Sequence, residues 1–234
     1  MFAPQLDALA PDYRVIAYDH RARTALGGSA YDLYDLAQDC VNLLDALEIE
    51  QCLLVGMSMG GFMALRCALR RPDRLAGVVL IGAGARPYTA EEQQMWDARY
   101  TAQEALPTVS RAFAEDEARY CFGTSTYSRS PGLVEHWVDR WTRIPSHVLV
   151  HETRSWVFQD DITDRLREIA VPVVALHGLE DTAVPLVHAQ ATIAAIRGAQ
   201  MIEIPGAGHT VNLERPAAVN NALRMCARSV LEPG

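Results

Sequence analysis

Basic clusters are scarce in this sequence, and so are long hydrophobic runs. Its 234 residues hold 21 Lys and Arg against 29 Asp and Glu, which gives a net charge of −8 and a pI near 5.3. Because nucleic acids and anionic membranes select basic surfaces, this balance argues against both as partners. The uncharged apolar stretch at Ala76–Ala85 is about half the length needed to span a bilayer, and no basic segment followed by an apolar core marks the N-terminus. We therefore expect a soluble, cytoplasmic protein.

Cysteine is also sparse, and its pattern excludes a disulfide framework. The five cysteines are odd in number and include no Cys-x-x-Cys pair. This pattern is typical of reduced thiols that pack as small apolar side chains, which agrees with a cytoplasmic location. The residues concerned are Cys40, Cys52, Cys67, Cys121 and Cys226.

Signals for a metal ion or a nucleotide cofactor are weak, and we expect neither. His147 and His151 lie four residues apart with Glu152 beside them, but a zinc site needs a third ligand and polar groups that orient the ligands. A solvated helix face explains this cluster better. Gly82 and Gly84 do not form a dinucleotide fingerprint, because the third glycine and its strand–helix context are missing.

Hydrophobic spacing predicts strands that alternate with helices, the order that produces a parallel sheet. Half of the residues are apolar, and the chain is long enough to bury one α/β core. The expected strands are short apolar runs at Tyr13–Tyr18, Leu53–Val55, Ala76–Ile81, Val171–Leu176 and Met201–Ile204. The expected helices are at Phe2–Ala10, Tyr31–Leu47 with Asp32 at its start, Met59 to about Arg71, Leu186–Ile196 and Arg215–Val230 with Pro216 in its first turn.

The alternation stops between about Pro87 and Ile169. This region carries all four tryptophans and shows no convincing strand. We interpret it as a mostly helical cap, residues 87–169, inserted into a core made of residues 1–86 and 170–234. Most of its aromatic rings are expected to form a small core within the cap, while a few face a substrate. The candidates for substrate contact are Trp137, Trp141 and Trp156.

The stretch from Leu53 to Ala64 joins an apolar, β-prone run to a Gly-x-Ser-x-Gly turn and a helix-prone run. This is the strand–turn–helix context of a nucleophile elbow, with Ser58 as the nucleophile. Side chains two residues either side of the serine are expected to collide with the neighbouring strand and helix, which explains Gly56 and Gly60. The helix N-terminus then points backbone N–H groups, that of Met59 foremost, at an oxyanion.

Two further residues with suitable chemistry follow predicted strands. Asp181 and His209 each come just after a strand, as Ser58 does, and the carboxyl ends of parallel strands share one edge of the sheet. A serine hydroxyl needs a base to take its proton, and the pKa of an imidazole is suited to that task. Asp181 is placed to accept the other ring N–H, which fixes the tautomer of His209. The sequence therefore predicts a catalytic triad in the order Ser, Asp, His.

From about Phe2 to its end the chain resembles the α/β-hydrolases. Residues 56–61 match the nucleophile segment of that family, 177–181 its acid segment and 206–209 its histidine segment. Within the family, the Ser-Met-Gly-Gly elbow and the sequence at 160–166 are most similar to 3-oxoadipate enol-lactonase-like esterases and lactonases. The resemblance implies a mostly parallel, doubly wound sheet with a helical cap.

The sequence departs from the family pattern before Phe2–Leu6. Members of the family place there a strand and a His-Gly-containing loop, which supplies the second oxyanion N–H, and neither is present in this chain. In the family, the strand that this chain lacks lies in the sheet between the strand that corresponds to Tyr13–Tyr18 and the strand before Ser58. Three explanations are open: a truncated or misassigned N-terminus, closure of the gap by the remaining strands, or a strand donated by another chain. A second departure is the lack of glycines after Asp19-His20-Arg21.

Other residues compete for roles in this site. Glu180 is an alternative to Asp181, but the family's His-Gly-x-x-Asp spacing selects Asp181. We expect His177 to be a hydrogen-bonded structural histidine rather than a second base. Arg86 and Arg129 are candidates for orienting a substrate carboxylate, although surface arginines are common.

The resemblance implies a serine hydrolase that cleaves small, largely apolar esters or lactones through an acyl-enzyme. Carbon–carbon bond hydrolases and cofactor-free perhydrolases carry similar elbows and stay open as alternatives. A weakly catalytic small-molecule-binding protein with a hydrolase fold is an alternative of another class. The expected partner is a small-molecule ester or lactone, and a homodimer is favoured because a missing strand leaves edges and apolar surface to cover.

Overall fold

The computed structural model describes residues 1–231, and these are built around a parallel sheet of four strands. The strands are β1 (Cys52–Met57), β2 (Leu75–Ile81), β3 (Val173–Gly178) and β4 (Gln200–Ile204), and they lie side by side in that order. β2 is almost continuously apolar and buried, as a central strand covered on both faces must be. The last three residues of the expected core segment 170–234 lie outside the described residues.

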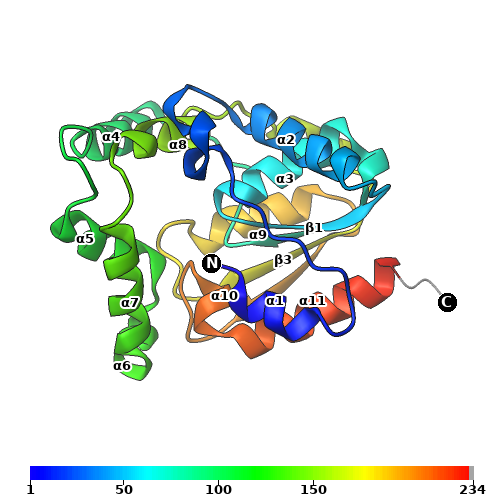
Figure 1. Cartoon of the computed structure of the whole chain (residues 1–234). Coiled ribbons are helices and arrows are strands. Elements are labelled where there is room, and N and C mark those ends of the chain that lie inside the picture. The colour runs from blue at the N-terminus through cyan, green and yellow to red at the C-terminus, as the bar shows by residue number, and fades with distance from the viewer. Residues whose placement is uncertain (232–234) are drawn as a thin grey trace.

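Helices cover both faces of this sheet (Figure 1). One face carries α2 (Leu33–Ala46), α3 (Met59–Arg70) and α9 (Leu186–Ala195), whose apolar side chains form the larger part of the core. The opposite face carries α1 (Ala3–Leu9), the short α10 (Val211–Glu214) and α11 (Pro216–Leu231) around a second apolar cluster. The expected fold class, a doubly wound α/β sheet, is confirmed.

Local signals placed most of these elements correctly. Asp32 caps α2 by accepting hydrogen bonds from the N–H groups of Tyr34 and Asp35, and the Asp35 carboxylate accepts one from the N–H of Asp32 in return. α3 ends at Arg70, before Pro72, which cannot continue a helix. Pro216 occupies the first turn of α11, as predicted.

A helical insertion separates β2 from β3 and lies to one side of the sheet (Figure 1). It comprises α4 (Ala90–Thr101), α5 (Arg111–Cys121), α6 (Thr124–Arg129), α7 (Pro131–Trp141) and α8 (His147–Val157). Buried apolar residues of α5, α7 and α8 form a separate small core, which partly buried rings such as Trp137 and Trp141 cover. We call this segment the helical insertion below.

The strand predicted at Tyr13–Tyr18 is wrong. No residue of this segment is in a strand, and Ile16 and Tyr18 are exposed. A strand requires a partner for its backbone N–H and C=O groups, and among residues 1–231 β1 pairs with β2 alone. The remaining strands therefore do not close the gap beside β1, which excludes one of the three explanations for the departure at the N-terminus.

Two further expectations concern thiols and membranes. All five cysteines are free, and Cys40, Cys67 and Cys226 are buried. Within residues 1–231, no helix has both the length and the apolar character that crossing a membrane would require.

A buried cation fastens α3 to the end of the helical insertion. The Arg66 side chain is fully buried, and its Nε and Nη2 donate to Asp160 Oδ1 at 2.9 and 2.6 Å. Its Nη1 donates to the carbonyl of Phe62 at 3.0 Å, and the hydroxyl of Tyr34 donates to the other oxygen of Asp160 at 2.7 Å. Asp160 thus supplies the negative charge that this buried guanidinium requires.

We expect Asp160→Asn to lower the free energy of unfolding by about 1.5–3 kcal/mol, because it leaves the buried guanidinium of Arg66 without a counter-charge. Urea denaturation measures this loss. Asp73→Asn is the matched control, since Asp73 pairs with Arg71 on the surface and its change is expected to cost less than about 1 kcal/mol. Equal effects of the two changes would contradict this account of Arg66.

Candidate active site

Ser58 stands on a strained turn between β1 and α3. Its φ of 52° and ψ of −119° lie in a region that L-residues rarely adopt, as a nucleophile elbow requires. A Cβ at Gly56 would lie 2.2 Å from the carbonyl oxygen of Gly60, and one at Gly61 would lie 2.4 Å from the Cβ of Ala83. The turn therefore requires glycine at both positions.

The steric role predicted for Gly60 is wrong. A Cβ at Gly60 would meet no atom within 4 Å, because this position faces away from β1 while its backbone carbonyl approaches Gly56. The close packing predicted on that side of the serine occurs at Gly61, one residue later in α3.

The elbow is fixed to the sheet by its backbone. The N–H of Ser58 donates to the carbonyl of Ile81, the last residue of β2, at 2.8 Å. Met59 is the first residue of α3, so its N–H precedes the hydrogen bonds that the helix makes within itself. That N–H and the positive end of the helix dipole are therefore placed beside the serine, where an oxyanion would form.

Asp181 and His209 meet at the same edge of the sheet. Asp181 follows β3 and is 8% exposed, and its Oδ2 lies 2.9 Å from Nδ1 of His209. Its Oδ1 accepts hydrogen bonds from the N–H groups of Ala183 and Val184, both at 2.9 Å. These two donors hold the carboxylate in place and leave Oδ2 for the imidazole.

The surroundings of His209 favour its charged form. Burial of the ring opposes protonation, but the negative charge of Asp181 and its hydrogen bond, with smaller contributions from Glu117 and Glu214, outweigh burial and raise the pKa of His209. The hydrogen bond from Nδ1–H to Asp181 leaves Nε2 as the nitrogen that can accept a proton. This arrangement suits a general base, because the imidazolium that forms when His209 takes a proton is stabilised by Asp181.

His177 has the structural role expected of it. Its ring is fully buried, and Nε2 donates to the carbonyl of Val184 at 2.9 Å. Burial lowers the pKa of His177, and the nearby charge of Asp181 does not reverse this effect. A neutral His177 therefore packs behind Asp181 and does not compete with His209 as a base.

The competing candidates are engaged elsewhere. The carboxylate of Glu180 accepts hydrogen bonds from the N–H of Ser125 and the hydroxyls of Ser125 and Thr124, so it does not reach His209. Arg86 pairs with Glu92 at 2.7 Å. Arg129 donates to three acceptors, the hydroxyl of Thr126 and the carbonyls of Gly206 and Glu214.

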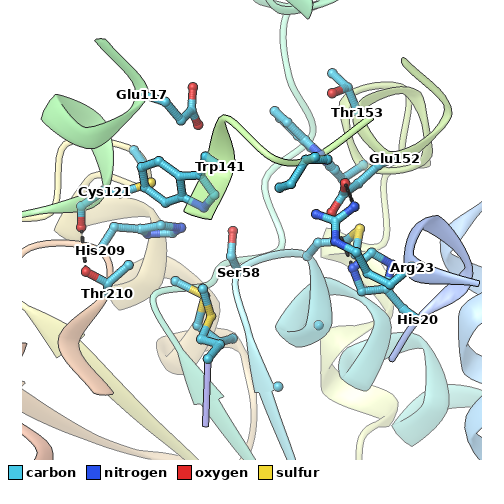
Figure 2. Close-up of a pocket in the computed structure, with 18 of the residues that line it drawn as sticks. His20, Arg23, Ser58, Glu117, Cys121, Trp141, Glu152, Thr153, His209 and Thr210 are labelled. Atoms are coloured by element: carbon cyan, nitrogen blue, oxygen red, sulfur yellow. Dashed lines mark hydrogen bonds and ion pairs between the residues drawn. The ribbon is translucent and has the colours of Figure 1, made fainter. Parts of the chain in front are cut away.

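Ser58 and His209 line one cavity of about 920 Å³ between the sheet edge and the helical insertion. Figure 2 shows Ser58 pointing into it, with His209 on one side. Among residues 1–231 the hydroxyl of Ser58 has no hydrogen-bond partner, and contacts between a nucleophile and its base are often loose in a ligand-free site. The cavity wall includes the three expected tryptophans and one more, namely Trp96, Trp137, Trp141 and Trp156.

The opposite wall of the cavity carries a charged cluster that sequence reasoning missed (Figure 2). Glu152 Oε1 lies 3.3 Å from Nε2 of His20, and Oε2 lies 3.1 Å from Nη1 of Arg23. Burial raises the pKa of Glu152, but the hydrogen bond from His20 and the charge of Arg23 outweigh it and lower the pKa overall. Glu152 thus pairs with His20 and Arg23 at the cavity wall, and not with His147 or His151 on its own helix.

No group of three His, Cys, Asp or Glu side chains among residues 1–231 is arranged to hold a metal ion. The cluster of His20, Arg23 and Glu152 brings together residues more than a hundred positions apart, and no local pattern indicates such a contact.

A second missed residue is Glu214, which lies five positions after His209 and is buried. The one signal in the sequence is a lone carboxylate between the histidine and the proline that begins α11. Its contacts are described below.

Comparisons with known proteins identify relatives that are named as hydrolases. The "Putative carbamate hydrolase RutD" of Variovorax paradoxus is 29% identical over 99% of this chain and 88% of that relative. The 3-oxoadipate enol-lactonase 1 of Acinetobacter baylyi is 26% identical over 92% of this chain and 79% of that relative. The solved structure of a thermophilic esterase from Thermogutta terrifontis, 26% identical, superposes with a TM-score of 0.90 over 98% of this chain and 85% of that one. A family model described as the alpha/beta hydrolase family matches residues 1–222, and the chain therefore belongs to this family of hydrolases.

Proposed function

We propose that the protein is a serine hydrolase that cleaves carboxylic esters or lactones of small, largely apolar substrates. One observation carries the proposal: the free hydroxyl of Ser58 opens into the cavity that also exposes His209, whose Nδ1 is bound at 2.9 Å to the buried carboxylate of Asp181. This is the set of groups that nucleophilic acyl transfer needs.

In the proposed reaction Ser58 Oγ attacks the substrate carbonyl while Nε2 of His209 takes the hydroxyl proton. The charge of Asp181 stabilises the imidazolium, and the N–H of Met59 stabilises the oxyanion. His209 then gives the proton to the leaving alcohol, which departs and leaves an acyl group on Ser58. Water, deprotonated by the same imidazole, hydrolyses this ester and restores the free serine.

The aromatic wall supports an apolar acyl group. The rings of Trp96, Trp137, Trp141 and Trp156 lie on the side of the cavity formed by the helical insertion, which we propose acts as a cap over Ser58. Such rings bind apolar groups and exclude water from the reacting carbonyl.

The five free thiols agree with the cytoplasmic location that we propose for the enzyme.

The relatives favour carbamates as a second candidate substrate class. A carbamate carbonyl is attacked in the same way as an ester carbonyl, and the relative from Variovorax paradoxus is named for this activity. The same cavity and the same three residues would serve, so substrate preference distinguishes the two candidates.

We expect the protein to hydrolyse p-nitrophenyl acetate and a short γ- or δ-lactone, and Ser58→Ala to lower kcat for the ester by at least about 10³-fold, because the nucleophile is lost. Release of p-nitrophenol and the acid formed from the lactone are measured. Ser29→Ala, at an exposed position away from the cavity, is the control and is expected to retain activity.

Full activity in Ser58→Ala would contradict the serine mechanism. Turnover of an alkyl carbamate with none of the ester or lactone would favour the second candidate. Tight binding of an ester analogue that survives Ser58→Ala, with turnover at background, would indicate a binding protein with a hydrolase fold.

The raised pKa of His209 predicts the acidic limb of the pH profile. Only the neutral imidazole accepts the serine proton, so a raised pKa keeps His209 inactive to higher pH, and kcat/KM is expected to rise with a midpoint above about 6.5. In Asp181→Asn the attraction is lost while burial remains, so the His209 midpoint, followed by ¹H–¹⁵N NMR, is expected to fall. Glu180→Gln is the control and is expected to leave the midpoint of the His209 titration unchanged. A midpoint that is unchanged in Asp181→Asn would contradict the assignment of Asp181.

Trp141→Ala is expected to raise KM for p-nitrophenyl butyrate about tenfold and to change KM for the acetate less, because a longer acyl chain buries more apolar area against the ring. Steady-state kinetics on both esters measures the difference. Tyr127→Ala, on the same helical insertion but outside the cavity, serves as the control. Equal changes for both esters would mean that Trp141 does not contact the acyl chain.

A further inference from the structure

Glu214 is a buried carboxylate whose contacts flank the candidate catalytic histidine. It is 6% exposed, and its Oε1 accepts hydrogen bonds from the N–H of Gly208 and the hydroxyl of Thr210, both at 3.0 Å. These two residues stand directly before and after His209 in the chain. One oxygen of Glu214 therefore holds the residues on both sides of His209, through the backbone of Gly208 and the side chain of Thr210.

The other oxygen of Glu214 binds the helical insertion. Oε2 accepts a hydrogen bond from the N–H of Gly123 at 2.9 Å and another from the hydroxyl of Thr126. The carbonyl of Cys121 accepts from the N–H of Thr210 at 2.9 Å and lies 3.0 Å from its hydroxyl, whose single proton is shared between this carbonyl and Oε1 of Glu214. The side chain of Glu214 thus joins the loop of His209 to Gly123 and Thr126 of the helical insertion.

Close backbone packing makes this junction tight. A Cβ at Gly208 would lie 2.4 Å from the nitrogen of Gly123, and a Cβ at Gly178 would lie 2.2 Å from the oxygen of Gly208. The loop that carries His209 is therefore held between the end of β3 and the helical insertion. Small displacements of either neighbour act on the histidine backbone directly.

The charge of Glu214 has no cationic partner. Among residues 1–231 no Lys, Arg or His forms an ion pair with it, and Arg129 donates to its backbone carbonyl only. A buried carboxylate held by neutral donors alone is costly unless every acceptor is used. An apolar side chain would leave the N–H groups of Gly123 and Gly208 without an acceptor, and a glutamine would turn its NH₂ toward one of them, so both oxygens of a carboxylate are needed to hold the loop of His209 to the insertion.

We propose that Glu214 is a positioning residue for His209, which sets the orientation of the imidazole by fixing Gly208 and Thr210 and uses Gly123 and Thr126 of the helical insertion as its outer anchor. This inference rests on the proposed function for its effect on rate but not for its effect on the geometry of His209. A misplacement of about 1 Å in a reacting group can cost about 10²-fold in rate.

Glu214→Gln tests the proposal with little change in shape. The amide NH₂ replaces one of the two oxygens, so the backbone N–H at that position, of Gly123 or of Gly208, loses its acceptor, while the neighbouring threonine hydroxyl can turn to accept from the amide. We expect kcat for p-nitrophenyl acetate to fall tenfold or more while KM changes less than about threefold. The NMR signal of the Nδ1–H of His209, which reports its hydrogen bond to Asp181, is expected to shift or broaden.

Two matched variants separate positioning from a general loosening of the insertion. Glu180→Gln weakens another carboxylate contact to the same insertion, at Ser125 and Thr124, without touching the loop of His209. It is expected to leave both kcat and the His209 signal close to those of the wild type. Thr126→Val removes one of the two bonds at Oε2, together with the bond that Thr126 accepts from Arg129, and leaves the bond from Gly123 in place. Its effects on kcat and on the His209 signal are therefore expected to lie between those of the other two variants.

An unchanged His209 signal together with an unchanged kcat in Glu214→Gln would overturn the proposal. Equal losses in Glu180→Gln and Glu214→Gln would also overturn it, because the effect would then belong to the insertion as a whole. If the wild type shows no turnover that depends on Ser58, the proposed function fails, and the His209 signal alone then decides whether Glu214 positions the ring. If the Glu214→Gln protein fails to fold, Thr126→Val becomes the deciding variant. An unchanged His209 signal and an unchanged kcat in Thr126→Val would then overturn the proposal.

Discussion

The site depends on the parallel pairing of β2 with both of its neighbours. Pairing of β1 with β2 runs to Met57 and Ile81, and one further backbone bond, from the N–H of Ser58 to Ile81, carries the same ladder into the elbow. Pairing of β2 with β3 brings the end of β3 to the same edge, and Asp181 follows it. β4, paired with β3, then delivers the loop of His209. Because every strand runs in one direction, three residues far apart in sequence meet where the strands end.

The buried carboxylates at this edge of the sheet are held mainly by hydrogen bonds from neutral donors. Asp181 receives two backbone N–H groups and the imidazole, while Glu214 receives two backbone N–H groups and two hydroxyls. Neutral donors satisfy the oxygens of a buried carboxylate without a cation that would compete for it. In the case of Asp181 this leaves the negative charge available to His209. In the case of Glu214 the same device fixes the backbone that carries the ring.

Most of the fold and the candidate site could be predicted because their signals are local. The caps of α2, the proline limits of α3 and α11, and the Gly-x-Ser-x-Gly turn each reside within a few residues. The strand expected at Tyr13–Tyr18 failed for the opposite reason, since strand formation depends on a partner that the described residues do not provide. The charged cluster of His20, Arg23 and Glu152 was missed because only tertiary packing brings α8 against the segment before α2.

The unpaired edge of β1 borders the cavity of the candidate site. The cavity that holds Ser58 is also lined by Val55, Gly56 and Met57 of β1 and by Ala17 and Tyr18. β1 offers unpaired backbone groups on this side, because within residues 1–231 it pairs with β2 alone. Any segment that paired with β1 in parallel would end beside Ser58, since the carboxyl ends of parallel strands share one edge. For the proposed reaction, the backbone N–H groups that followed such a segment are candidates for a second oxyanion donor, and loss of one such donor costs about 10²–10³-fold in rate. If the proposed reaction holds, pairing at this edge of β1 affects its rate as well as the stability of the sheet.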